Sequence, residues 1–383
     1  MAIILGWRVI VLGMAALRLP MFATQQGAAS PAAPTSVREQ VAKNPVDPSA
    51  LLALALQLEA EGKQAEATAA VQQALRLAPW SSKTLMQASA YFLRTGNEAH
   101  ALPTLRRVID VSRGEINSSL WQMLVTALDT EAHRDFFIAT ARENPTWWLT
   151  FFGQACERGK NVSGIQAVFA ARAQAGVATA DERRLIIERM ERDGRWADAR
   201  QIWFDSLPAD QRRRATLLFN GSFEFPLSNL GFDWLVPAQE GVEVTRQAID
   251  GMTGQRALNV TFVNKRYSEP PLFQYLMLQP GAYRFEGQGR TDLESWLGLQ
   301  WGIYCGQGAA ERELRQLTRT DRFIGSMDWR DFRHDFVVPG DCPVQVLRLE
   351  LANPRRDATT PGAAIVRLKG RVWFDALDVQ PLG

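Results

Sequence analysis

The sequence predicts two domains of different class, an α-solenoid followed by an antiparallel β-sandwich. Three observations lead to this prediction. Residues 47–213 show helical apolar spacing, which recurs at a fixed interval between Asp47 and Arg113. From Phe219 onward, apolar and polar residues alternate in short runs, which is the period of a β-strand. The chain has 383 residues, enough for two or three domains with a core each.

The first 29 residues are typical of a targeting segment. A single basic residue precedes the apolar run Val9–Leu17, which suits a signal-peptide core and is shorter than the roughly 20 residues of a membrane span. Ala23 and Ala29 offer small-residue cleavage sites. We expect residues 1–29 to direct export to the periplasm or cell envelope, as a cleaved signal peptide or an uncleaved anchor. An apolar tail left by a misassigned start codon is the third interpretation. An Ala/Ser/Pro-rich linker follows over residues 30–46.

The chain repeats itself between Asp47 and Arg113. Gly62 and Gly96 lie 34 residues apart, which is the period of tetratricopeptide-type helix pairs. Small and apolar residues recur with the same spacing: Leu51 and Leu85, Leu58 and Phe92, Ala67 and Ala101, Val71 and Leu105, and Ala74 and Val108. The glycines allow the turn inside each pair, and Pro79 ends the second helix.

Residues 62–67 (GKQAEA) and 74–79 (ALRLAP) resemble the tetratricopeptide repeat family. The same turn glycine followed by alanines recurs at 192–199, so we expect four to five helix pairs across residues 47–213. The resemblance implies a concave groove that holds a peptide or an envelope protein partner. A rigid spacer without a ligand is the alternative.

The C-terminal region, residues 214–383, has the pattern of a β-sandwich. Residues 256–262, 345–351 and 371–377 alternate apolar and polar side chains. Asn-Gly, Asp-Gly and Pro-Gly dipeptides separate such runs and are turn signals. Eight to ten strands in this length predict two packed antiparallel sheets. The segment that joins the two domains, residues 205–210, is short, which favours packed domains.

Both ends of this domain resemble carbohydrate-binding modules with a galactose-binding-like jelly-roll fold. The matching residues are 220–224 (NGSFE), 231–234 (GFDW) and 372–379 (VWFDALDV). The resemblance implies a structural calcium ion between the first and last strands, with Glu224 and Asp375 as its ligands. The alternative is that these carboxylates accept hydrogen bonds at strand ends. No other cofactor is expected.

Tryptophan is unusually frequent, with 12 Trp against 5 Tyr. Flat indole faces stack on the apolar C–H faces of sugars. Trp296, Trp301, Trp329 and Tyr267 have charged neighbours in sequence that would bind sugar hydroxyls, so we expect them to bind carbohydrate. Trp301 and Trp373 also alternate into apolar strands, and a core position is the alternative for these two.

The three cysteines bear on the compartment. In an exported protein Cys305 and Cys342 can form a disulfide, and the sequence has no Cys-x-x-Cys or Cys/His spacing typical of zinc. Two free core thiols are the alternative. Cys156 lies alone in a helical pattern and is expected to be a buried, reduced residue.

Composition and motifs exclude several function classes. The net charge is +2, so no basic excess favours nucleic acid as a partner. The sequence has no phosphate-binding loop, nucleophile elbow, zinc-protease motif or dinucleotide fingerprint, and its three histidines are far apart. A glycosidase carboxylate pair has no sequence signature in this fold, and none stands out. We therefore expect no catalytic residues.

The layout as a whole resembles envelope proteins associated with bacterial exopolysaccharide gene clusters, through residues 280–285, 298–305 and 336–339. This resemblance implies an exported, non-catalytic adaptor in exopolysaccharide production or export. Its sandwich would contact the polysaccharide and its solenoid a protein of the same machinery. The alternatives are an assembly scaffold without sugar binding and a polysaccharide-modifying enzyme.

Overall fold

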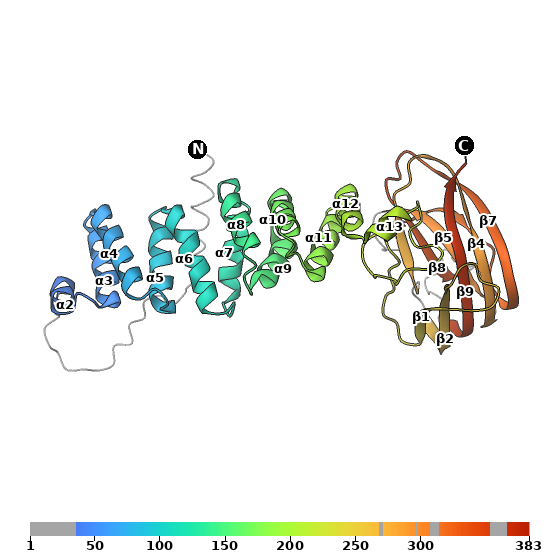
Figure 1. The fold of residues 1–383 in the computed structure, drawn as a ribbon, viewed down its shortest axis with the longest axis horizontal. Coiled ribbons are helices and arrows are strands. Elements are labelled where there is room, and N and C mark those ends of the chain that lie inside the picture. Colours follow the sequence, from blue (N-terminus) through green and yellow to red (C-terminus); the bar gives the residue numbers. More distant parts are fainter. Residues whose placement is uncertain (1–35, 268–270, 296, 307–313, 353–365, 383) are drawn as a thin grey trace. The chain divides into compact units, whose positions relative to one another are not determined.

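The computed structural model describes residues 36–267, 271–295, 297–306, 314–352 and 366–382. Its chain divides into two compact units, residues 1–182 and 183–383. The described part of the first unit is helical, and the second carries two antiparallel sheets (Figure 1). The predicted fold class, helices followed by an antiparallel β-sandwich, is therefore confirmed. The predicted leader lies outside the described residues.

Short helices follow one another along the first unit (Figure 1). They are α2 (Val37–Lys43), α3 (Pro48–Ala60), α4 (Gln64–Leu77), α5 (Ser82–Arg94), α6 (Glu98–Val111), α7 (Ser118–Leu128), the 3-10 turn η1 (Glu131–His133), α8 (Arg134–Arg142), α9 (Trp148–Arg158) and α10 (Val162–Gln174). The division falls within α11 (Ala180–Arg192), and the second unit contains α12 (Trp196–Ser206) and α13 (Ala209–Arg213). Within the described ranges, no helix is long and apolar enough to cross a membrane.

The 34-residue period of the sequence is the period of the helix pairs. Helices α5 and α6 begin and end 34 residues after α3 and α4. Gly62 and Gly96, in the turns of the two pairs, have φ of 74° and 69°, a conformation that L side chains rarely adopt. Ala67 and Ala101 are fully buried, so the helices of each pair approach closely. Glycine and alanine at this spacing therefore shape each pair.

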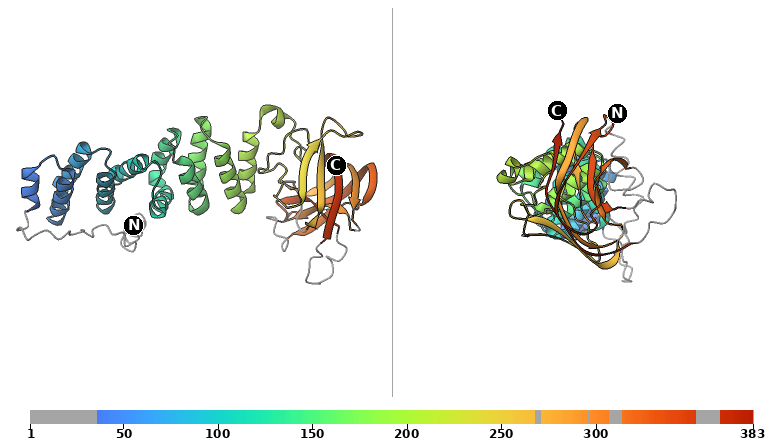
Figure 2. Two further views of the ribbon diagram at one scale, coloured as in Figure 1. Left: turned by 90° about the horizontal axis from the view of Figure 1, so that it is seen from below. Right: turned by 90° about the vertical axis from the view of Figure 1, so that its right-hand side faces the viewer.

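The sandwich of the second unit has nine described strands, coloured yellow to red in Figure 2. One sheet has the order β1 (Val242–Gln247), β2 (Ala257–Tyr267), β9 (Val366–Pro381), β4 (Gly281–Glu294) and β7 (Gly325–Val338). The other has the order β3 (Phe273–Leu276), β8 (Gln345–Leu351), β5 (Leu299–Cys305) and β6 (Arg315–Arg319). The three alternating runs noted in the sequence lie in β2, β8 and β9.

The segment expected to open the sandwich as a strand, residues 220–224, has a turn at residues 220–222 and no strand. It still lies beside the last strand, because the Leu377 N–H donates to the Gly221 carbonyl at 3.0 Å. A Cβ on Gly221 would lie 1.9 Å from the Leu377 carbonyl oxygen, so only glycine fits here. The left-handed backbone of Asn220, with φ of 53°, bends the chain away from an extended path.

Aromatic rings fill the space between the two sheets. Trp301 of β5 is fully buried, and its ring centroid lies 5.0 Å from that of Phe374 in β9 and 5.6 Å from that of Trp234. Phe285 and Phe323 complete this buried group. Trp301 therefore joins the inner faces of both sheets.

The last helices pack on the sandwich. The ring of Trp196 in α12 lies 4.9 Å from that of Tyr275 in β3, and Trp203 lies 5.0 Å from Phe219. These two tryptophans lie in the range that the sequence pattern assigned to the solenoid, and they contact the β-domain.

The Glu191 carboxyl in α11 has a raised pKa. Burial, with the Glu188 carboxylate nearby, raises its pKa to about 7.

We expect Trp301→Ala to lower the free energy of unfolding of the sandwich by about 3 to 5 kcal/mol, because it leaves a large cavity in a core that cannot fully collapse. Thermal unfolding followed by near-ultraviolet circular dichroism measures this. Trp80→Ala is the matched control, because the Trp80 side chain is 71% exposed. Equal melting temperatures for the two variants would contradict a core role for Trp301.

Candidate functional site

The outer face of the four-stranded sheet carries charged and polar side chains that are withdrawn from water. Tyr304 and Glu350 are 3% exposed, and Arg348 is 5% exposed. Their neighbours in sequence, Ile303 and Leu347, point to the core on the opposite face. Polar residues on the outer face of an antiparallel sheet are usually solvated, so burial here is unusual.

One row of residues crosses this sheet in register. Phe273 of β3 pairs with Arg348 of β8, Arg348 with Gly302 of β5, and Gly302 with Arg319 of β6. Directly opposite residues share a face and have Cβ atoms about 5 Å apart. The antiparallel pairing therefore brings one aromatic and two cationic side chains from separate strands together.

The Glu350 carboxylate is the centre of this group. The Tyr304 hydroxyl donates to its Oε1, Gln300 Nε2 donates to the same atom at 3.2 Å, and Arg348 Nε donates to Oε2 at 2.8 Å. Arg319 Nε lies 3.3 Å from Oε1. We call Gln300, Tyr304, Arg319, Arg348 and Glu350 the Glu350 cluster.

The Tyr304 ring lies between the two arginines. Its centroid is 4.3 Å from the guanidinium carbon of Arg348 and 5.8 Å from that of Arg319. Arg319 Nε also donates to the Tyr304 oxygen at 3.0 Å. Burial raises the pKa of the Tyr304 phenol and the Glu350 carboxylate raises it further, so the phenol stays protonated and donates.

Gly302 makes this arrangement possible. A Cβ at this position would lie 2.5 Å from Cε2 of Tyr304. The missing side chain leaves the space that the tyrosine ring occupies. The cluster therefore depends on a glycine in the middle of β5.

The structure contradicts the predicted carbohydrate-binding role of Trp301. It places Trp329, another of the predicted residues, on the other sheet. Trp301 is fully buried against Phe374 and cannot stack on a sugar, so that prediction is wrong. Trp329 is half-buried in β7 of the other sheet, where its indole N–H donates to the Asp250 carbonyl at 2.8 Å. Trp296 and the side chain of Tyr267 lie outside the described residues.

The two expected calcium ligands bind one loop. Asp375 Oδ2 accepts from the Thr253 N–H at 2.6 Å and Oδ1 from the Ala376 N–H at 2.7 Å, while Glu224 Oε1 accepts from the Gln255 N–H at 2.7 Å. Burial raises the pKa of Asp375 to about 6, and the Glu224 carboxylate adds to this effect.

These contacts match the alternative role, in which the carboxylates hold backbone N–H groups. Calcium would use the same carboxylate oxygens of Glu224 and Asp375 as ligands. Among the described residues, no group of three or more His, Cys, Asp or Glu side chains is placed to hold a metal. Calcium binding stays a prediction.

The cysteines of the sandwich lie together beside the cluster. The structure joins Cys305, the residue after Tyr304, to Cys342, with their Cα atoms 5.5 Å apart. That separation is normal for a disulfide. Cys156 is buried in α9.

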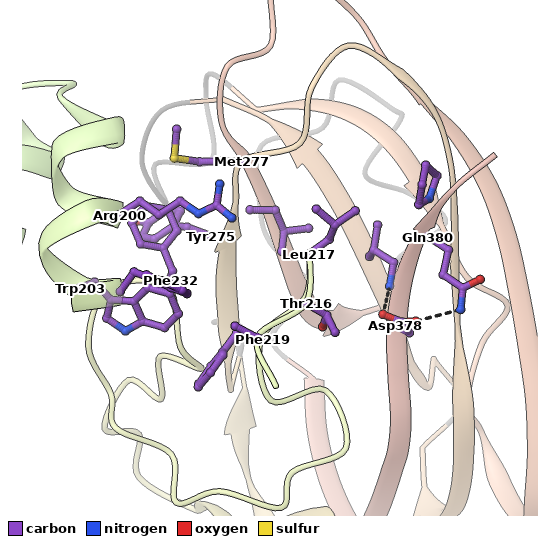
Figure 3. A pocket seen from close by; sticks show the side chains of 15 residues that line it. Arg200, Trp203, Thr216, Leu217, Phe219, Phe232, Tyr275, Met277, Asp378 and Gln380 are labelled. Atoms are coloured by element: carbon purple, nitrogen blue, oxygen red, sulfur yellow. Dashed lines mark hydrogen bonds between the residues drawn. The ribbon is translucent and has the colours of Figure 1, made fainter. Parts of the chain in front are cut away.

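A groove of about 460 Å³ lies between α12 and the sandwich (Figure 3). Its apolar wall consists of aromatic rings that pack on each other, including Trp203 and Phe219. Its acid, Asp378, already accepts from the Val379 N–H and from Gln380 Nε2, both at 2.9 Å. Because its aromatic wall is formed by the packing of Trp203 in α12 on Phe219 and Phe232, we assign the groove to helix packing.

The comparisons with known proteins concern the C-terminal β region. The sequence matches no protein-family model and no curated protein. A solved CBM4 structure is 15% identical and covers 43% of this chain and 99% of its own, with a TM-score of 0.31. The CBM22-1 xylan-binding domain from Paenibacillus barcinonensis is 14% identical and covers 42% of this chain and 91% of its own, with a TM-score of 0.30. TmCBM61, solved with β-1,4-galactotriose, is 16% identical and covers 44% of this chain and 99% of its own, with a TM-score of 0.30. Similarity this distant assigns no function to the chain.

Sequence reasoning missed the Glu350 cluster. The alternation of residues 345–351 does place Arg348 and Glu350 on one face, opposite Leu347 and Leu349. That pattern alone suggested a solvated face. Only the pairing of β5 with β8 and β6 shows that the face gathers partners from three strands.

Gly302→Ala tests the geometry of the cluster. Although alanine suits a strand better than glycine, we expect a loss of about 1 to 3 kcal/mol of stability, because the new methyl group displaces the Tyr304 ring. Gly340→Ala is the control, since a Cβ there would meet no atom within 4 Å. Thermal unfolding compares the two variants, and an unchanged melting temperature for Gly302→Ala would refute the packing described.

Proposed function

We propose that the sandwich binds a polysaccharide at the Glu350 cluster and that the protein is an exported, non-catalytic adaptor. The observation that carries the proposal is a set of oriented hydrogen-bonding groups gathered on the outer face of a sheet. Sugar hydroxyls need such donors and acceptors, and the C–H faces of sugars need an apolar ring. Phe273, half-buried and in register with Arg348, is an apolar ring beside the cluster.

The chemistry of the cluster supports binding over hydrolysis. Glycosidases use two carboxyl groups, about 5 to 10 Å apart, one of which transfers a proton. The Glu350 cluster contains one carboxylate, and it is engaged by Arg348 at 2.8 Å and Arg319 at 3.3 Å. A carboxylate held by two guanidinium groups is suited to orienting donors and poorly suited to donating a proton.

The outer face of the five-stranded sheet is the second candidate surface, because it carries Trp329. Its charged side chains form exposed pairs, such as Arg284 with Asp335 at 2.7 Å and Lys369 with Glu294 at 2.9 Å. Exposed pairs of this kind contribute little free energy and remain hydrated. We therefore place the polysaccharide on the four-stranded sheet and treat Trp329 as the alternative.

The helical unit is proposed to contact a protein of the same machinery through a tetratricopeptide-type groove. The 34-residue period supports this architecture. Trp80, which is 71% exposed between α4 and α5, offers a large aromatic contact. A role in exopolysaccharide production or export rests on the leader and on the resemblance of the layout. The competing proposal is an assembly scaffold that binds no sugar.

A glycan array probed with the purified protein tests the proposal. We expect Phe273→Ala to weaken binding to any glycan identified by about ten- to hundredfold, as expected for losing 1 to 3 kcal/mol of apolar contact. Trp80→Ala should bind as the parent does. Loss of binding in Trp329→Ala with Phe273→Ala unaffected would move the site to the five-stranded sheet. If the protein binds no glycan, the sugar-binding proposal fails and the assembly scaffold remains as the proposed function.

Export is tested through the cysteines. In protein taken from its native compartment, we expect Cys305 and Cys342 to be linked and Cys156 to be reduced, as mapped by mass spectrometry. The disulfide closes a loop with a sequence separation of 37 residues, and we expect it to contribute about 3 to 4 kcal/mol to stability. Three free thiols, or an inactive periplasmic reporter fused to the chain, would contradict export.

A further inference from the structure

We propose that the polysaccharide is acidic and that the Glu350 cluster binds a sugar carboxylate through the terminal Nη groups of Arg319 and Arg348. The inference rests on the proposed function and adds the class of ligand. It follows from the charge of the cluster, from the hydrogen-bonding groups that its arginines leave available, and from its aromatic neighbour.

The cluster carries more positive than negative charge. Two arginines face one carboxylate, and both Arg348 and Glu350 are nearly fully buried. The neighbouring cation on β6, Arg315, is balanced by Asp341 at 2.6 Å. Glu350 balances one of the two cations, so a bound anion would balance the other, Arg319, whose side chain is 23% exposed.

The arginines are fixed at one end. Arg348 Nε donates to Glu350, and Arg319 Nε donates to Tyr304. Among the described residues, no hydrogen-bond partner contacts the terminal Nη groups of either arginine. A guanidinium fixed in this way presents paired donors that match the two oxygens of a carboxylate.

The cluster is reached from the edge of the sheet. Strand β6 is the edge strand, and the Arg319 side chain on it is 23% exposed. Phe273 lies at the other end of the same cross-strand row. A uronic acid brings an apolar ring face together with its carboxylate, so it fits this row better than inorganic phosphate, which has no such face.

The test uses matched ligands. Polygalacturonate, alginate and hyaluronan are compared with the same polymers after reduction of their carboxyl groups to alcohols. We expect at least one acidic polymer to bind ten times or more as tightly as its reduced form. Its affinity should fall as NaCl is raised from 50 to about 500 mM, because salt screens the charges. Inorganic phosphate should compete only weakly.

Two variants identify the arginines. Arg319→Gln should weaken binding of the acidic polymer about ten- to hundredfold and leave binding of the reduced polymer nearly unchanged. Arg348→Lys keeps the charge but loses the paired donors, so an intermediate loss is expected. Arg333→Gln removes one exposed charge from the other sheet, where Arg333 pairs with Glu286 at 3.2 Å, and should have no effect.

The outcomes separate the two proposals. Equal affinity for acidic and reduced polymers, or binding to neutral glycans alone, would overturn the acidic ligand and leave glycan binding in place. Phosphate competing as well as galacturonate would also overturn it. Binding to no glycan of any class would overturn the proposed function as well. Because the polymer comparison uses the parent protein, it decides the question even if a variant fails to fold.

Discussion

The register of β5 between β8 and β6 is the constraint on which both the core and the candidate site depend. All seven residues of β5 are buried, so the strand has two occupied faces. Trp301 points inward to Phe374, while Gln300 and Tyr304 point outward to Glu350. Because side chains alternate, a slip of one residue would exchange the faces and place polar groups in the core. Core packing therefore holds the cluster in position.

The two faces of β5 make opposite energetic contributions. Burial of Trp301 and its neighbouring rings stabilises the sandwich through the hydrophobic effect. Burial of Arg348 and Glu350 on the other face requires desolvation, and their mutual attraction offsets it only in part. The disulfide at Cys305 fixes the end of the same strand. A stable core and a covalent link thus support the polar cluster.

The two units offer surfaces of different chemistry. The helical unit repeats one pair geometry, so its surface extends by repetition and suits a long, shallow contact. The sandwich concentrates its unusual groups at one cross-strand row, which suits recognition of a few sugar units. An adaptor needs both kinds of surface in one chain. This division is the physical basis of the proposed role.

The sequence by itself determined the helix pairs and the strand pattern. The spacing of Gly62 and Gly96 and the alternation of residues 345–351 are local properties, because each reports on neighbours along one element. Tertiary structure alone decided which aromatic and charged residues are available to a ligand. Residues 299–305 are nearly all apolar or aromatic, so their sequence gives no period that distinguishes the inward face from the outward one. The pairing of β5 with β8 and β6 makes that distinction. It buries Trp301 and assembles the Glu350 cluster from residues up to 50 positions apart.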